Sequence, residues 1–130
     1  MGTFSFPKSE RLYKKKDIQE LFDKGSSFYL YPFKVIIQKP ADLDTNQVLF
    51  SVSKKNFKKA VDRNLIKRRM REAYRLNKAA LPQTSKLQMA YIYTAKDILE
   101  FDKIRDKMVA SFKRLGEDEI GNSKTRTKAE

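Results

Sequence analysis

The sequence of 130 residues contains no cysteine and no histidine. Without cysteine the chain has no disulfide, no thiolate nucleophile and no zinc–thiolate site. Without histidine it lacks the side chain that most often serves as general base near neutral pH and as transition-metal ligand. We therefore expect no catalytic residue, no metal site and no bound cofactor on the protein itself.

Long apolar runs are also missing. Stretches such as Val35–Ile37 and Ala90–Tyr93 are far shorter than the roughly 20 residues that a membrane-spanning helix needs. Residues 1–16 contain no apolar segment of the signal-peptide kind. We expect a cytoplasmic protein without a membrane partner, and the absence of cysteine fits a reducing compartment.

Acidic residues are scarce relative to basic ones. The 29 Lys and Arg against 16 Asp and Glu give a formal net charge of +13, which favours a polyanionic partner. Nucleic acid is the first candidate and an anionic membrane surface the second. The length fits one domain, which we place at residues 8–116. Residues 1–7 and 117–130 are expected to be flexible, because the tail carries only one large apolar residue, Ile120.

Hydrophobic periodicity and turn residues predict seven elements. We expect three helices, over residues 15–24, about 58–81, and 97 or 100 to 115. Four strands are expected over residues 28–30, 33–38, 48–53 and 87–94. Gly25, in a left-handed conformation, and Gly116 should end the outer helices, and Pro82 the middle one.

This order predicts an α+β fold, a two-layer α/β sandwich with three helices and a four-stranded, mostly antiparallel sheet (αβββαβα). Pro32 should separate the first two strands because it cannot donate to a strand ladder. Residues 40–46 read as a turn, so the strands on either side of it should pair as a hairpin. Phe33, Val35 and Ile37 should face the core.

The middle helix carries most of the charge. Residues 51–78 hold eleven Lys or Arg against Asp62 and Glu72, a net nine of the thirteen positive charges. At about 100° per residue, one arc of the helix is apolar and another is cationic. The apolar arc contains Ile66, Met70, Ala73 and Tyr74; the cationic arc contains Arg63, Asn64, Lys67, Arg68, Arg71, Arg75 and Lys78.

A charge run is often only a solvated helix face. Here Arg63, Lys67, Arg71 and Arg75 form an unbroken i,i+4 series of like charges, which destabilises an isolated helix. A bound polyanion would relieve that repulsion, and arginine presents a planar fork to phosphate oxygens. We interpret this helix as an RNA-binding element.

A second candidate surface is the sheet face opposite the core. It would carry Lys34, Ile36 and Gln38 on one strand and Ser51 and Ser53 on the next. If the basic helix and the first helix, with Phe22, border this face, the trough between them suits a single nucleic-acid strand. Taken alone, Phe22 would more commonly be an ordinary core residue. Tyr91 and Tyr93 could be core-edge residues or stacking platforms.

Two motifs in sequence point to a family. The strand ending Ser51-x-Ser53-Lys54-Lys55 and the helix with Arg63-Asn64-x-x-Lys67-Arg68-x-x-Arg71 resemble the protein subunit of bacterial ribonuclease P. The resemblance covers about residues 8–115, including Arg11-Leu12, Asp17, Phe22 and Gly25 upstream. Leu65 departs from the usual Arg-Asn-Arg, Ile18 and Ile36 stand where the family often has aromatics, and the linker from Lys55 to Arg63 is about one residue longer.

The resemblance implies a left-handed βαβ crossover, against the usual right-handed rule. It implies an accessory subunit of an endoribonuclease that removes the 5′ leader of precursor tRNA, with the chemistry and Mg²⁺ on the RNA subunit. The implied partners are the catalytic RNA and precursor tRNA, with no obligate protein partner.

The resemblance also implies two sets of binding residues, to which neighbouring basic and aromatic residues are added. The catalytic RNA should meet Arg63, Asn64, Lys67, Arg68, Arg71 and Arg75. The leader should meet Phe22, Lys34, Ile36, Ser51, Ser53, Lys54, Lys55 and Tyr93.

Two other functions remain open from the residues alone. A DNA-binding regulator could use residues 63–78 as a recognition helix, but it would need a partner helix immediately upstream, where we expect a strand. A ribosome-associated RNA-binding protein without an enzymatic role is the other.

Overall fold

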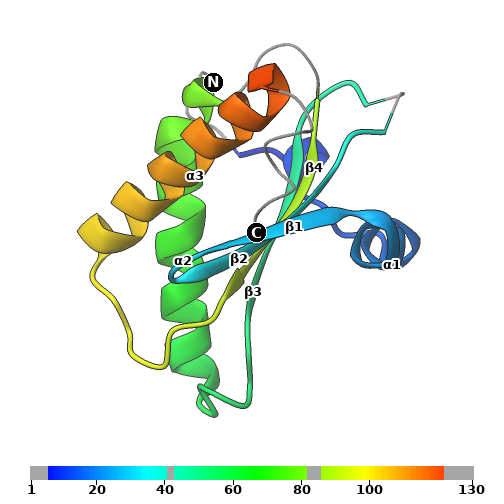
Figure 1. The fold of residues 1–130 in the computed structure, drawn as a ribbon. Coiled ribbons are helices and arrows are strands. Elements are labelled where there is room, and N and C mark those ends of the chain that lie inside the picture. Colours follow the sequence, from blue (N-terminus) through cyan, green and yellow to red (C-terminus); the bar gives the residue numbers. More distant parts are fainter. Residues whose placement is uncertain (1–5, 41–42, 82–85, 122–130) are drawn as a thin grey trace.

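A computed structural model describes residues 6–40, 43–81 and 86–121. Figure 1 shows the elements in chain order. They are η1 (Lys8–Glu10), α1 (Lys15–Lys24), β1 (Ser26–Leu30), β2 (Phe33–Gln38), β3 (Gln47–Val52), α2 (Ala60–Asn77), η2 (Lys78–Ala80), β4 (Gln88–Tyr93) and α3 (Phe101–Gly121). All seven predicted helices and strands are confirmed, most within two residues at each end.

The sheet has the order β1-β2-β4-β3. β1 pairs antiparallel with β2, β2 antiparallel with β4, and β3 parallel with β4. The predicted hairpin of β2 with β3 is therefore wrong, because β4 lies between them, and β1 and β2 form the hairpin instead. β4 is buried at five of its six residues, as a central strand covered on both faces should be.

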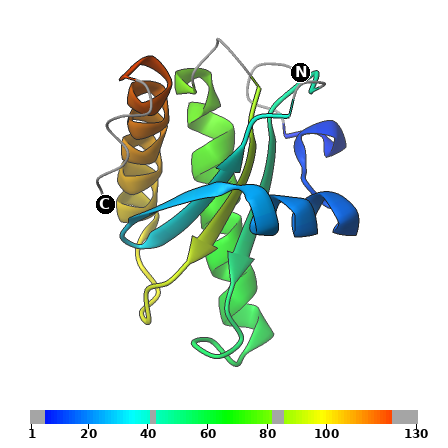
Figure 2. The same cartoon turned by 45° about the vertical axis from the view of Figure 1, so that its right-hand side comes forward.

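Helices cover the two faces of the sheet unequally. α2 and α3 pack side by side on one face, and α1 crosses the other face (Figures 1 and 2). The chain passes from β3 through α2 to β4 in a left-handed crossover (Figure 2). Since α1 and α2 lie on opposite faces, the expected trough with these two helices as its walls is wrong. The face under α2 and α3 is called the core face below, and the other the open face.

The main core lies between the core face and α2 and α3. The buried residues of α2 are the four predicted from the helical wheel, Ile66, Met70, Ala73 and Tyr74. The ring of Tyr74 packs edge-on against Phe50, Phe112 and Phe6, so Phe6, expected in a flexible end, joins this core. A smaller cluster under α1 consists of Leu12, Leu21, Ile36 and Ala90.

Gly25 ends α1 as predicted, but not in the predicted conformation. Gly25 follows α1 but has φ −73°, an extended conformation open to any residue, so its left-handed assignment is wrong. Its position requires glycine for space: a Cβ would lie 2.6 Å from the Leu21 carbonyl oxygen and 2.8 Å from that of Ile37.

The helix α3 continues through Gly116 to Gly121, so its predicted end at Gly116 is wrong. Residues 1–5, Pro82 and residues 122–130 lie outside the described residues. No helix of the described ranges is both long and apolar enough to cross a membrane.

Candidate nucleic-acid interface

The outward face of α2 presents cations that no described residue pairs with. Asn64, Arg68 and Arg71 are exposed and Lys67 is half-buried. Within the described ranges none of these four side chains has a hydrogen-bond or ion-pair partner. Three cations on two adjacent turns, with no carboxylate between them, attract a polyanion.

The ends of the same charge series are engaged within the protein. Arg63 donates from Nη1 to the carbonyl oxygens of Phe57 and Lys58, at 2.8 and 2.9 Å. Arg75 forms a two-point contact with Glu72, Nε to Oε1 at 3.2 Å and Nη2 to Oε2 at 2.6 Å. This bond lowers the pKa of the Glu72 carboxyl and keeps it charged. Arg63 and Arg75 therefore retain only part of their hydrogen-bonding capacity for RNA.

Two further cations near this helix also have internal partners. Arg69 donates to the carbonyl oxygen of Leu99, which ties α2 to the loop between β4 and α3. Lys78, expected on the cationic arc, pairs with Glu10 at 2.7 Å. The cationic surface is thus centred on residues 64–71 rather than spread along the whole helix.

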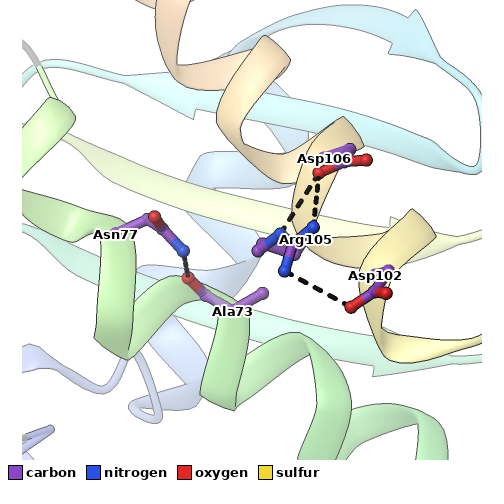
Figure 3. A network of polar contacts seen from close by, with 5 residues as sticks. All are labelled: Ala73, Asn77, Asp102, Arg105 and Asp106. Atoms are coloured by element: carbon purple, nitrogen blue, oxygen red, sulfur yellow. Dashed lines mark hydrogen bonds and ion pairs between the residues drawn. The ribbon is translucent and has the colours of Figure 1, made fainter.

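The neighbouring helix α3 shows the contrasting arrangement. Figure 3 shows Arg105 between two carboxylates of its own helix. Its guanidinium lies 3.3 Å from Asp102 Oδ1 and 3.1 Å from Asp106 Oδ1. The same view shows Asn77, near the end of α2, donating to the Ala73 carbonyl oxygen at 2.9 Å. The charge of Arg105 is therefore offset locally, as expected on an ordinary solvated helix.

The register of the sheet defines the open face. One cross-strand row runs Tyr29, Lys34, Ile92 and Ser51. Lys34 and Ser51 do share this face, as predicted, but Ile92 lies between them. The next row, Ser27, Ile36, Ala90 and Leu49, runs under α1, and Ile36 is only 6% exposed. Ile36 therefore lies on the expected face but is covered, because Leu21 of α1 packs on it.

Around this row lie the other predicted leader residues. Phe22 on α1 is 46% exposed, so the alternative that it is a core residue is wrong. Ser53 accepts a hydrogen bond on Oγ from the Lys55 amide, at 3.0 Å. This contact shapes the turn after β3, where Lys54 and Lys55 are exposed.

Tyr93 does not belong to this surface. By strand alternation it faces the core, where its ring packs against Phe33 and Phe57 and is 1% exposed. Its hydroxyl donates to the Asp97 carbonyl oxygen and accepts from the Leu99 amide. Burial raises the pKa of this hydroxyl. The prediction of Tyr93 as a leader contact is wrong, and its neighbour Ile92 takes that face.

Sequence reasoning missed two residues of the open face, Tyr29 and Ile92. Both follow from alternation once the register is known, since Tyr29 pairs with Lys34 and Ile92 lies on the other side of Lys34.

The described residues contain no group of three acidic side chains that could hold a metal ion. These residues do not fit a metal, and Mg²⁺ remains a prediction for the RNA subunit.

Comparison with known proteins decides between the functions left open. A family model described as Ribonuclease P matches residues 6–116. The chain belongs to the ribonuclease P protein family. The ribonuclease P protein component of Porphyromonas gingivalis is 34% identical over 120 residues, covering 87% of this chain and 88% of that protein.

Solved ribonuclease P proteins share the fold. The Staphylococcus aureus protein has TM-score 0.69 and 28% identity, covering 82% of this chain and 94% of that one. The Thermotoga maritima protein has TM-score 0.70 and 29% identity, covering 81% and 96%. These matches support an α+β fold with a four-stranded mixed sheet.

Membership in the family assigns the role of the chain. It is the protein component of ribonuclease P, an endoribonuclease of tRNA processing, and it associates with the ribonuclease P RNA. The comparisons do not favour a DNA-binding regulator or a ribosome-associated protein. The fold agrees, because a strand, β3, precedes α2 instead of the helix that a helix-turn-helix requires.

Proposed function

We propose that this protein holds two RNAs on two sides of its sheet. The outward face of α2 binds the ribonuclease P RNA, and the open face binds the single-stranded 5′ leader of precursor tRNA. The observation that carries the proposal is the set of Lys67, Arg68 and Arg71, which have no partner among the described residues. This set lies across the sheet from a row with an exposed aromatic residue and Lys34.

The two surfaces differ in the chemistry that they offer. Closely spaced arginines on a helix suit the phosphates of a folded RNA, since each guanidinium can contact two oxygens. The open face offers exposed aromatic rings, the hydroxyl groups of Ser51 and Ser53, and a few cations. Rings for bases and cations for phosphates suit a single strand.

The protein supplies binding and charge neutralisation, whereas the RNA subunit supplies the catalysis. Neither histidine nor cysteine is present, and the buried tyrosines have raised pKa values that keep them protonated. Cations that bind the leader reduce the electrostatic repulsion between the substrate and the catalytic RNA. This repulsion is strongest at low ionic strength, where salt screens it least. We place this activity in the cytoplasm.

Reconstitution with the cognate ribonuclease P RNA at low Mg²⁺ tests the proposal. The protein is expected to stimulate leader removal and to bind leader-bearing precursor more tightly than leaderless tRNA. No stimulation would reject the role of the protein, and equal affinity for the two substrates would reject leader binding.

The variants Arg68→Ala and Arg71→Ala test the α2 surface. Each should weaken binding to the ribonuclease P RNA by roughly tenfold, and lower the slope of log affinity against log salt by about 0.7 to 0.9 for each phosphate that the variant no longer neutralises. Arg105→Ala is the matched control: it removes an equal charge from a guanidinium that Asp102 and Asp106 already bind. Equal reductions in affinity in all three variants would mean that net charge alone drives binding.

A further inference from the structure

Tyr29 is the most exposed aromatic residue of the open face. Its ring is 55% exposed, and it lies opposite Lys34 in the β1–β2 ladder. Large apolar side chains on strands are normally covered, and Tyr29 departs from this rule. The preceding residue, Phe28, follows it: Phe28 packs on the core and lies under the Arg114 guanidinium. The two faces of β1 therefore treat their aromatic residues differently.

The ring of Tyr29 is held in place although it is exposed. Its hydroxyl lies 3.1 Å from Thr94 Oγ1. Thr94 Oγ1 donates to the Pro32 carbonyl oxygen at 3.0 Å, so Tyr29 is the donor to Thr94. The side chain thus joins β1 to the end of β4, and little rotational freedom is left to lose on binding.

One other tyrosine, Tyr13, is equally exposed but is placed differently. The ring of Tyr13 is also 55% exposed, but the Lys8 ammonium lies 5.2 Å from its centroid. Tyr13 lines a pocket of about 450 Å³ with Asp44 and Gln47, at the far end of β3 from Ser51. Tyr29 instead shares its cross-strand row with the cation Lys34. Ile92 and Ser51 continue the same row, and both are half-exposed.

We propose that Tyr29 is a stacking platform for one base of the bound RNA leader, with Lys34 contacting the adjacent phosphate. The inference rests on the proposed leader binding and adds the residue that contacts one of the leader bases. A fixed aromatic face accepts any base, so it selects an unpaired nucleotide rather than a sequence. The Tyr29 hydroxyl group orients the ring through its hydrogen bond to Thr94 and does not itself contact the RNA.

The test uses the holoenzyme reconstituted with ribonuclease P RNA and precursor tRNAs that carry a single abasic site at successive leader positions. Tyr29→Ala should weaken binding of the intact precursor about tenfold. Tyr29→Phe should retain most of the affinity, because it keeps the ring. Tyr29→Leu keeps a bulky apolar side chain on the strand and should lose binding as the alanine variant does. Tyr13→Ala, the matched exposed tyrosine, should bind as the wild type.

The abasic series separates stacking from a structural effect. One leader position should cost the wild type about tenfold when abasic, and at that position wild type and Tyr29→Ala should bind equally. A loss in Tyr29→Ala that is the same at every abasic position, or no loss at all, overturns the stacking role while leaving leader binding intact. If the wild type itself does not prefer leader-bearing over leaderless substrate, leader binding fails, and the stacking role fails with it.

Discussion

The two faces of the sheet are built from alternate residues of the same strands, yet they behave differently. On the core face, Phe33, Tyr91 and Tyr93 are buried, and both tyrosine hydroxyl groups are satisfied inside the protein. On the open face, Lys34 and Tyr29 are exposed and Ile92 is half-exposed. The core face stabilises the fold, and the open face is the surface that we propose for the leader. Substitutions on neighbouring residues should therefore have different consequences.

The largest contrast is expected between two adjacent residues of β2. Phe33→Ala empties a fully buried ring site and should lower the free energy of unfolding by about 3–5 kcal/mol. Lys34→Ala should change stability by less than about 0.5 kcal/mol and instead weaken binding of leader-bearing precursor. Urea unfolding and substrate affinity, measured on both variants, check the pair. Similar stability losses in both would remove the distinction between the faces.

A smaller effect is expected at Gly25, where α1 meets the open face. Gly25→Ala should destabilise the protein by about 1–3 kcal/mol, because its Cβ would collide with two backbone carbonyl oxygens. Gly116→Ala, in the interior of α3, should instead stabilise it by about 0.5–1 kcal/mol. Thermal unfolding of the two variants distinguishes them by sign. A stabilising Gly25→Ala would show that α1 can move away from β2.

The smallest contrast concerns tyrosine ionisation on the core face. Burial raises the pKa of Tyr91 far above its ordinary value of about 10. Above pH 10 the unfolded chain therefore loses this proton while the folded chain keeps it. Stability should fall with rising pH by about 1.4 kcal/mol per pH unit for this residue.

Urea unfolding between pH 8 and 11 checks this effect. Tyr91→Phe should show a slope shallower than that of the wild type by this amount. Equal slopes in the wild type and Tyr91→Phe would mean that Tyr91 ionises in the folded state as it does in the unfolded chain.

The features predictable from sequence are those set by local periodicity. The buried arc of α2 follows from the spacing of Ile66, Met70 and Ala73 alone, and the β2 range follows from its alternation. Strand order does not, since β4 inserts between β2 and β3 through pairings between residues far apart in the chain. Tyr93 was misplaced for a related reason: β4 is apolar at nearly every position, so alternation alone does not tell which half faces the core.

The candidate site shows the same division. The exposure of Arg68 and Arg71 follows from the helical wheel. The use of Arg63 as a donor to the Phe57 and Lys58 carbonyl oxygens depends on the path of the turn before α2, which no periodicity specifies. The space that requires glycine at position 25 depends on how closely α1 approaches β2, again a tertiary property.

The position of β4 also bears on how the protein is made. This strand lies inside the sheet but follows β1, β2 and β3 in the chain, so β2 and β3 are not joined through it until residues up to Tyr93 have left the ribosome. Until then each has an unpaired edge, and such edges favour aggregation during synthesis. The basic helix α2 emerges earlier but lacks the sheet that buries Met70 and Tyr74. A finished RNA-binding surface therefore arises only after β4 has been synthesised.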